Sequence, residues 1–255
     1  MFSIINSRSA LLSVTALLLA GLGACAPVKG ADSVDDQQLA DENTGLEDTG
    51  SPDDDGSDDQ NQDPLFYPRD CQAIADADPG SVDGEFMLYA EGDGKKPWKA
   101  YCAGMPDQPQ EYLLLSRAGG GSNEAQYPCD GGAWGSTVWT TVYAVSINPR
   151  TFKVDSRDLS FSSSGGECNT FTLLTELPWG YAGTCNGDTN GTANIDLAGT
   201  PFVVAADAFA VEGWNAGGSA VYQNGGRQVD LHGGGYCGSM SPASADGTIP
   251  LKYTP

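Results

Sequence analysis

A single histidine limits the catalytic chemistry that is open to this 255-residue chain. That histidine is His232, and three glycines follow it. A zinc protease of the common helical type needs two histidines one helical turn apart with a glutamate between them, so the chain cannot build that site. A Ser-His-Asp triad would have to use His232 itself, and no nucleophile-elbow pattern presents a serine to it. We therefore expect His232 to be a hydrogen-bonded structural or surface residue, and we predict no catalytic residue and no cofactor.

Paired carboxylates are the other possible source of hydrolytic chemistry. Glycosidases place two acids at a fixed separation and raise the pKa of one of them. Glu167, Glu176 and Glu212 are candidates for such a pair. The residues after position 64 include 21 acids, so some pair is almost guaranteed by number alone, and the pattern carries little weight. An enzyme is the less favoured interpretation.

Asn186, Asp188 and Asn190 alternate in front of Gly191, as in the first half of a calcium-binding loop. The bidentate acid expected at loop position twelve is missing, because Leu197 stands there. A turn between two strands satisfies the same side chains through hydrogen bonds to the backbone. We favour the turn, predict no metal site, and keep the three residues as a weak calcium candidate.

Tryptophan offers a third kind of chemistry, because an exposed indole can stack on a sugar ring or anchor a protein partner. Trp179 and Trp214 each stand beside a glycine and are expected near loops, which makes them the candidate ligand-binding residues. Trp139 lies within an alternating apolar run and is expected in the core. The ligand would be a protein or a neutral glycan.

The cysteines indicate an oxidising compartment. Beyond Cys25, an even number remains without a Cys-x-x-Cys pair, which predicts three structural disulfides rather than a zinc or redox motif. These are Cys71, Cys102, Cys129, Cys168, Cys185 and Cys237. We predict that Cys71 pairs with Cys102, which would stabilise the domain by roughly 3–4 kcal/mol on the loop-entropy estimate. The other four cysteines allow three pairings, and all three stay open.

Cys25 follows a short apolar run with Arg8 in front of it, the layout of a secretory signal rather than of a membrane-spanning helix. The tetrapeptide Leu22-Gly23-Ala24-Cys25 resembles the lipobox of bacterial lipoproteins. The resemblance implies a signal peptide over residues 1–24 and lipidation of Cys25, whose acyl chains would bind a membrane. Ala26 replaces the aspartate that retains some lipoproteins in the inner membrane. We expect a bacterial cell envelope protein that is anchored in the outer membrane, with exposure at the cell surface as a further possibility.

Residues 25–69 have the composition of a disordered acidic linker. The stretch 26–64 holds 13 of the 34 acidic residues and one base, Lys29. It is poor in aromatic and β-branched residues, so it cannot bury enough apolar surface to offset the entropy of ordering. The net charge of −22 also argues against nucleic acid as a partner, because a binder must neutralise phosphates with Lys and Arg.

Residues 70–255 are predicted to form a single β-rich domain, all-β or nearly so. Cys71–Ala77 is the one stretch that predicts a helix. Alternating apolar residues, separated by Gly, Asn, Asp and Ser clusters, predict the strands. These are expected over 85–89, 98–102, 112–115, 138–147, 171–174, 193–197, 202–204, 220–222 and 228–231.

Two ordered sets of motifs resemble a known family. The first contains Asp70-Cys71, the stretch from Asp83 to Tyr89, and Pro97 to Cys102, and is similar also to the start of fibrinogen-type domains. The second set decides between the two families. It includes Val145-Ser146-Ile147-Asn148-Pro149, Phe152-Lys153-Val154-Asp155, Asp158-Leu159-Ser160-Phe161, Gly180 to Cys185, Gly191 to Leu197, Gly199-Thr200-Pro201-Phe202 and Gly235-Tyr236-Cys237-Gly238. Over residues 70–241 the chain resembles a GON domain.

GON domains are the C-terminal modules of certain secreted zinc metalloproteases with thrombospondin repeats, and similar domains occur in bacterial lipoproteins. The resemblance implies a β-rich extracellular accessory module and supplies no catalytic residues. Only the association with the family's zinc metalloproteases suggests metallopeptidase activity, since the chain itself has no zinc-binding motif. We expect a non-catalytic, lipid-anchored binding module. The alternative is a protease-associated or hydrolytic envelope protein.

Overall fold

The computed structural model describes residues 66–129, 135–169 and 173–255. Cys25 and the predicted signal peptide and linker lie outside these ranges, apart from residues 66–69. Within them, β-strands dominate, and α1 (Cys71–Ala77) has the bounds that the sequence predicts. No helix of the described residues is long and apolar enough to cross a bilayer. The predicted β-rich fold is confirmed.

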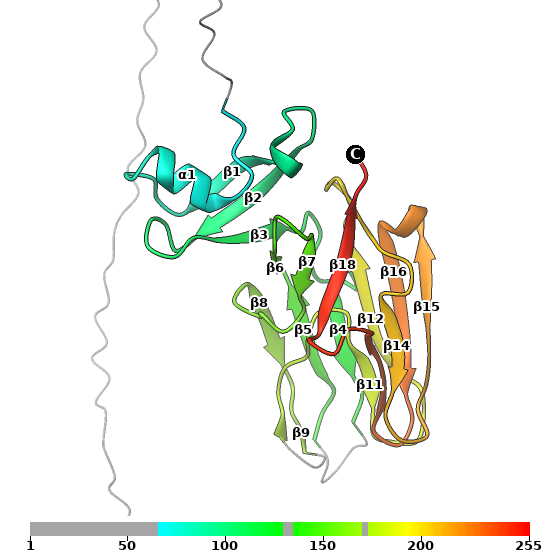
Figure 1. The fold of residues 1–255 in the computed structure, drawn as a ribbon. Helices are drawn as coiled ribbons and strands as arrows, with labels where there is room; N and C mark the ends of the chain where they lie inside the picture. The colour runs from blue at the N-terminus through cyan, green and yellow to red at the C-terminus, as the bar shows by residue number, and fades with distance from the viewer. Residues whose placement is uncertain (1–65, 130–134, 170–172) are drawn as a thin grey trace, which may run out of the picture. The chain divides into compact units, whose positions relative to one another are not determined.

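A seven-stranded sheet carries the N-terminal part of the domain and its C-terminal strand (Figure 1). Neighbouring strands with assigned pairings are antiparallel throughout. In spatial order they are β1 (Gly84–Tyr89), β2 (Pro97–Ala103), β3 (Gln110–Leu114), β6 (Ala144–Ile147), β7 (Lys153–Asp155), β18 (Thr248–Tyr253) and β13 (Phe202–Val204). Residues from both ends of the domain therefore share one sheet.

A six-stranded antiparallel sheet forms the second layer. Its spatial order is β15 (Gly217–Gln223), β16 (Gln228–Gly234), β12 (Gly191–Asp196), β4 (Glu124–Tyr127), β5 (Val138–Val142) and β8 (Ser162–Gly165). Two small sheets complete the described fold, together with the 3-10 turns η1 (Ala90–Gly92) and η2 (Asn224–Gly226). One small sheet has three strands, in the order β11 (Ala182–Thr184), β17 (Gly238–Pro242) and β14 (Phe209–Glu212). The other small sheet pairs β9 (Cys168–Asn169) with β10 (Leu173–Leu174).

One hydrophobic core joins the two large sheets. Trp98 and Phe202 of the first sheet meet edge to face, with ring centroids 5.4 Å apart. Val138, Ile195 and Leu231 of the second sheet belong to the same buried cluster. Alternate residues of each strand therefore face this shared interior, and the residues between them face outward.

The predicted strand over 138–147 is wrong as a single element. The chain runs as β5 in the six-stranded sheet, breaks at Tyr143, and continues as β6 in the seven-stranded sheet. Tyr143 is 49% exposed. Its N–H donates to the carbonyl of Phe161 beside β8, and its carbonyl accepts from the N–H of Leu115 beside β3 in the other sheet. The alternation persists across the break because both halves turn one face to the core.

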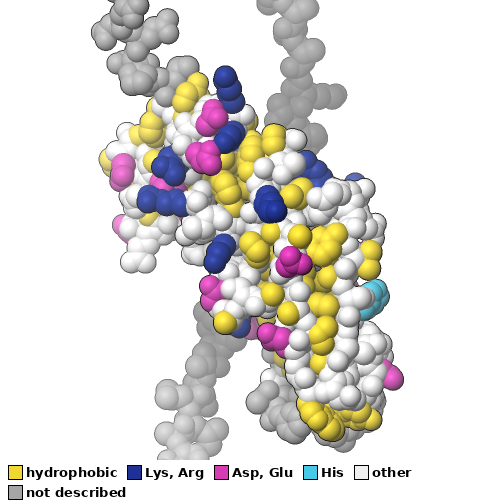
Figure 2. Space-filling model, turned by 45° about the vertical axis from the view of Figure 1, so that its right-hand side comes forward, with side chains coloured by type: hydrophobic (Ala, Val, Ile, Leu, Met, Phe, Trp, Pro, Cys, Tyr) yellow, Lys and Arg dark blue, Asp and Glu magenta, His cyan; other side chains and the backbone are white. Residues whose placement is uncertain are grey.

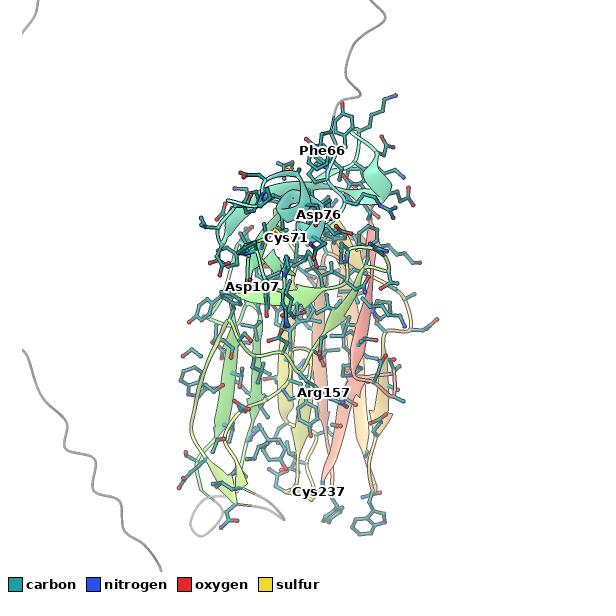
Figure 3. All side chains as sticks on the ribbon, turned by 60° about the vertical axis from the view of Figure 1, so that its left-hand side comes forward. Phe66, Cys71, Asp76, Asp107, Arg157 and Cys237 are labelled. Atoms are coloured by element: carbon teal, nitrogen blue, oxygen red, sulfur yellow. A yellow bond between two sulfur atoms is a disulfide. The ribbon has the colours of Figure 1, made fainter. Side chains whose placement is uncertain are left out.

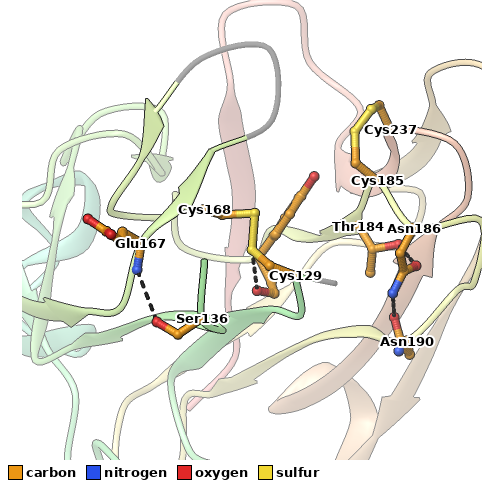
Figure 4. Close-up of a disulfide and its surroundings, with 10 residues drawn as sticks. Cys129, Ser136, Glu167, Cys168, Thr184, Cys185, Asn186, Asn190 and Cys237 are labelled. Atoms are coloured by element: carbon orange, nitrogen blue, oxygen red, sulfur yellow. Dashed lines mark hydrogen bonds between the residues drawn. A yellow bond between two sulfur atoms is a disulfide. The ribbon is translucent and has the colours of Figure 1, made fainter. Parts of the chain in front are cut away.

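Three disulfides link the described residues. Cys71–Cys102 is the predicted bridge and is confirmed. The sequence left the other pairings open, and the structure joins Cys129 to Cys168 and Cys185 to Cys237 (Figure 4). The second bridge links the chain after β4 to β9, and the third links the end of β11 to the turn between β16 and β17. Each bridge closes a loop across different strands, which stabilises the fold by restricting the unfolded chain.

A buried carboxylate anchors α1 to the seven-stranded sheet. Glu111 on β3 accepts a hydrogen bond from the backbone N–H of Cys71 at 2.7 Å, and the Asp70 side chain caps the helix by accepting from the N–H of Ala73. Burial raises the pKa of Glu111, and the hydrogen bond from Cys71 offsets only part of that shift. The folded state therefore holds a proton on Glu111 more readily than the unfolded chain does.

This difference makes a pH-dependent prediction. The stabilisation that comes from protonated Glu111 is present at acidic pH and is lost as the pH rises through its raised pKa. The variant Glu111→Gln keeps an oxygen acceptor for Cys71 and cannot ionise. We expect its urea midpoint to rise relative to wild type between about pH 4 and pH 7. A constant difference across this range, like that expected for the exposed Glu176→Gln control, would contradict the prediction.

Candidate functional site

The outward face of the six-stranded sheet aligns one residue from each strand in a continuous row. In the pairing register, Trp139 lies between Gly165 on one neighbouring strand and Gln126 on the other. From Gln126 the row continues to Thr192, then to His232, and ends at Ser219. Directly paired residues in a sheet project from the same face, with strands about 4.8 Å apart. The row therefore brings an indole, an amide, two hydroxyls and an imidazole onto one surface.

Trp139 corrects an expectation from the sequence, because it lies outside the core. Its neighbours Val138 and Thr140 are fully buried, whereas Trp139 is 38% exposed. The alternation of β5 has two faces, and Val138, Thr140 and Val142 occupy the inner one. Tyr143, just past the end of β5, adds a second exposed aromatic ring near this surface.

A second row of polar side chains lies beside the first. Asn194 on β12 donates from Nδ2 to Oδ1 of Asp230 at 2.7 Å, and its own Oδ1 accepts from the backbone N–H of Asn123 at 3.2 Å. On β4, the Gln126 amide donates to Oε1 of Glu124 at 2.6 Å. These hydrogen bonds restrict the rotamers of the surface groups, so they are held in place before any ligand arrives.

The two rows line a pair of open hollows. One hollow, of about 460 Å³, lies over β4, β5 and β8 and is lined by Trp139, Thr141 and Tyr143 among others. The second, of about 200 Å³, lies over β4, β12 and β16 and includes Asn194 and His232. Glu124 and Gln126 line both hollows, so the two adjoin on the outer face of the sheet, and we treat them together. We call the pair the sheet cleft.

A tight glycine turn borders the sheet cleft. Gly119 and Ser122 exchange backbone hydrogen bonds of 2.8 and 3.2 Å, and the two residues between them, Gly120 and Gly121, both have positive φ. Such a turn needs φ above zero at both central positions, which glycine adopts without a steric penalty. Gly119 and Gly120 line one hollow, and Gly121 lines the other.

The sheet cleft rests on a buried amide. Asn123 is fully buried, and its Oδ1 accepts from Nε1 of Trp179 at 3.1 Å and from the N–H of Asp196 at 2.9 Å. Its Nδ2 donates to the carbonyls of Arg117 at 2.7 Å and Asp196 at 2.8 Å. All four hydrogen-bonding positions of the amide are used. Asn123 thus ties the strands under the cleft to the core.

Trp179 is therefore a core residue rather than a ligand-binding one, which corrects the sequence-based expectation. It is 2% exposed, and its ring nitrogen is used by Asn123. Trp214 is 74% exposed and lies 5.3 Å from the ring of Tyr236, between centroids. This pair sits beside Cys237, and Figure 3 places Cys237 at the opposite end of the described domain from Phe66. Figure 2 shows an apolar cluster at that end.

The calcium candidate forms a turn. The side-chain oxygen of Asn186 accepts from Oγ1 of Thr184 at 2.8 Å and from the N–H of Asp188 at 3.0 Å (Figure 4). Asn186 Nδ2 also contacts Oδ1 of Asn190 at 3.4 Å. Two donors thus occupy the oxygen that a cation would need first. Among the described residues, no group of three or more His, Cys, Asp or Glu side chains could hold a metal ion.

The candidate acids of the sequence do not converge on the cleft. Glu167 lies before Cys168 and donates its backbone N–H to Ser136, while Glu176 and Glu212 are exposed on other segments. None of the three lines either hollow. The structure instead places Glu124, Asp230 and His232 in the cleft, and Asp230 accepts from two amide side chains, those of Asn194 and Gln223. Sequence reasoning missed Glu124, Gln126 and Asn194, because their strand partners cannot be found from local patterns.

Comparison with protein families places this geometry in context. The family model described as the GON domain matches residues 118–250, which include all six strands of the cleft sheet. The match begins after Cys102, so β1, β2 and β3 lie before it although they share a sheet with β6 and β18. No curated protein and no solved structure matches the chain. The chain belongs to the GON domain family.

Proposed function

We propose that this protein is a lipid-anchored, non-catalytic accessory module that binds a ligand outside the cytoplasm. The Leu22-Gly23-Ala24-Cys25 motif behind a short apolar run carries the proposal, since it predicts export and acylation of Cys25. Three disulfides support an oxidising compartment. The acidic residues 26–64 would act as a spacer between the membrane and the folded domain.

The sheet cleft supports binding rather than catalysis. Its carboxylates, Glu124 and Asp230, accept hydrogen bonds from neighbouring amides, and its histidine stands on the exposed face of β16 without a nucleophile-elbow motif nearby. Rings, amides and hydroxyls fixed on a rigid sheet form a recognition surface. The membership of the GON domain family supports an accessory role.

The anchoring step is tested by Cys25→Ser. In the bacterial host, we expect wild-type protein to sediment with membranes and to incorporate radiolabelled palmitate, because acyl chains on Cys25 bind the bilayer. The Cys25→Ser chain should carry no label and should leave the membrane fraction. Ala26→Ser introduces the same side chain one position later and should behave as wild type. Equal membrane partitioning of wild type and Cys25→Ser would overturn the anchor.

The membrane itself is part of the proposal. Ala26 supports the outer membrane in a host that has two, and labelling of intact cells with a non-permeant amine reagent tests surface display. The ten basic residues after position 64 offer lysines for that reagent. Labelling only after lysis would place the domain inside the outer membrane.

A further inference from the structure

We propose that the sheet cleft binds a neutral oligosaccharide, with the indole of Trp139 as the platform on which one pyranose ring stacks. The inference rests on the proposed binding function and names its ligand class and its site. The face of a pyranose ring is lined with C–H groups, whereas its rim carries hydroxyls. A site for it needs an exposed aromatic face surrounded by hydrogen-bonding groups, and the cleft supplies both.

The platform depends on a glycine. Gly165 on β8 lies directly opposite Trp139, and a Cβ added to it would come within 2.6 Å of Cζ2 of the indole. The indole therefore lies over the backbone of the neighbouring strand. The backbone of Gly165 is not in the left-handed region, so the turn chemistry of glycine is not what the position needs. Its missing side chain gives the ring a flat support.

This arrangement turns one side of the indole toward the sheet and leaves the ring 38% exposed. Tyr143 stands in the same hollow with 49% of its surface exposed. Each exposed ring leaves apolar area in contact with water, and a ligand that covers the ring would remove that area from water. The hollow beside these two rings has a volume of about 460 Å³, which lies within the usual range of roughly 300–1,000 Å³ for small-molecule sites.

Hydrogen-bonding groups continue from the platform along the row. Gln126, Thr192 and His232 follow Trp139 across three strand intervals, which is roughly 14 Å at ordinary strand spacing, about the length of a trisaccharide. Glu124 and Asn194 lie alongside in the second row. Amide and carboxylate side chains can both accept hydrogen bonds from sugar hydroxyls, and the amides can also donate to them. The mutual hydrogen bonds within the cleft hold these groups in fixed orientations.

Charge decides which glycans fit. No lysine or arginine lines either hollow in the part of the chain that the structure describes, and Glu124 and Asp230 contribute negative charge. Sulfated, phosphorylated or uronic-acid polymers would therefore meet repulsion without a compensating cation. On the face that Figure 2 shows, most of the basic side chains gather over the upper part of the molecule. A neutral ligand is the one that the cleft complements.

The experiment uses the full chain, solubilised in a detergent without a sugar headgroup so that the detergent cannot compete. Calorimetric titration is carried out with hexasaccharides of β-1,4-glucose, α-1,4-glucose, β-1,4-xylose, β-1,4-mannose and N-acetylglucosamine. We expect at least one to bind with a Kd below about 1 mM. If none of the five binds the folded protein, the inference is overturned.

Three variants test the site itself. Trp139→Ala should weaken binding by about tenfold or more, and Trp139→Phe should retain part of it because a ring face remains. Gly165→Ala should also weaken binding, because its methyl group displaces the indole from its support. Trp214→Ala removes a more exposed tryptophan away from the cleft and should bind as wild type. Near-ultraviolet circular dichroism confirms that each variant is folded.

The outcomes separate this inference from the function it rests on. Binding that is insensitive to Trp139→Ala and lost in Trp214→Ala would overturn the sheet cleft as the site, while the binding function would stand. Capture of a protein through Trp139 with no hexasaccharide binding would overturn the glycan class alone. If Cys25→Ser does not alter membrane partitioning, the anchored function fails, whereas hexasaccharide binding by the cleft would still support its ligand class.

Discussion

Replacement of Asn123 by alanine is expected to lower the free energy of unfolding by about 4 kcal/mol. The side chain is fully buried and makes four hydrogen bonds, to Trp179, to the N–H and the carbonyl of Asp196, and to the carbonyl of Arg117. Alanine leaves these partners without the amide, and each buried polar group that loses its partner costs about 1–3 kcal/mol. Water that enters the space recovers part of the sum.

A backbone effect adds to this loss. Asn123 has φ of 50°, in the left-handed region that asparagine tolerates better than alanine does. Asn215 provides the matched control, since its φ is 49° and it is exposed. The change Asn215→Ala therefore measures the backbone contribution without the buried hydrogen bonds. Urea denaturation of both variants at constant pH gives the comparison. If Asn123→Ala were no less stable than Asn215→Ala, the hydrogen-bond argument would be wrong.

The effect should extend to the sheet cleft. The backbone N–H of Asn123 donates to Asn194, and Asn194 in turn holds Asp230. A displacement at Asn123 therefore reaches both rows of polar groups on the outer face. Domains of this size are commonly stable by only about 5–15 kcal/mol, so the loss is a large fraction of the total. Asn123→Ala should for this reason also reduce hexasaccharide binding, although no ligand touches it.

Local sequence patterns were sufficient for the elements that follow strong rules. The start of α1 could be predicted because Asp70 supplies an N-cap in front of Cys71, the first helical residue, which is fully buried. Strands such as β2, β12 and β16 alternate apolar and polar residues, and one side of each faces the core. These features are local, so no knowledge of their partners is needed.

Two of the six strands that carry the candidate site, β4 and β8, were not predicted from the sequence. β4 is Glu-Ala-Gln-Tyr and β8 is Ser-Ser-Ser-Gly, compositions with weak intrinsic preference for a strand. They become strands because β5 lies between them and pairs with both. The value of Gly165 depends on its register with Trp139, and register is a tertiary property. Sequence reasoning therefore placed Trp139 in the core, because it could not find the glycine that supports the ring at the surface.

The disulfides show the same limit. Cys71–Cys102 was predictable because the two cysteines flank the first hairpin and lie near each other in sequence. The pairing of Cys185 with Cys237 depends on β11 reaching β17, which a local pattern cannot show. The family assignment rests on ordered motifs spread over the chain, so it survived errors in individual strands and tryptophans.

Trp179 gives the second large effect. Its substitution by alanine is expected to lower the free energy of unfolding by about 3–5 kcal/mol, because a fully buried indole leaves a cavity that its neighbours cannot fill. Trp179→Phe keeps most of the ring volume and loses the hydrogen bond to Asn123, for a cost of about 1 kcal/mol. Trp214→Ala, at a position 74% exposed, should alter stability by less than about 0.5 kcal/mol. Thermal and urea denaturation of the three variants tests this order.

The pair Asn123 and Trp179 then provides a test of the proposed coupling between the core and the cleft. Both single alanine variants remove the same Nε1–Oδ1 hydrogen bond, so the double variant should lose less stability than the two single losses combined. Strict additivity would mean that the two residues act independently, and the cleft would then lack the support described above. A binding loss in Trp179→Phe without a matching loss of stability would indicate instead that the amide orients the cleft strands directly. Either result depends on one buried contact, whose two side chains come from segments 56 residues apart in the chain.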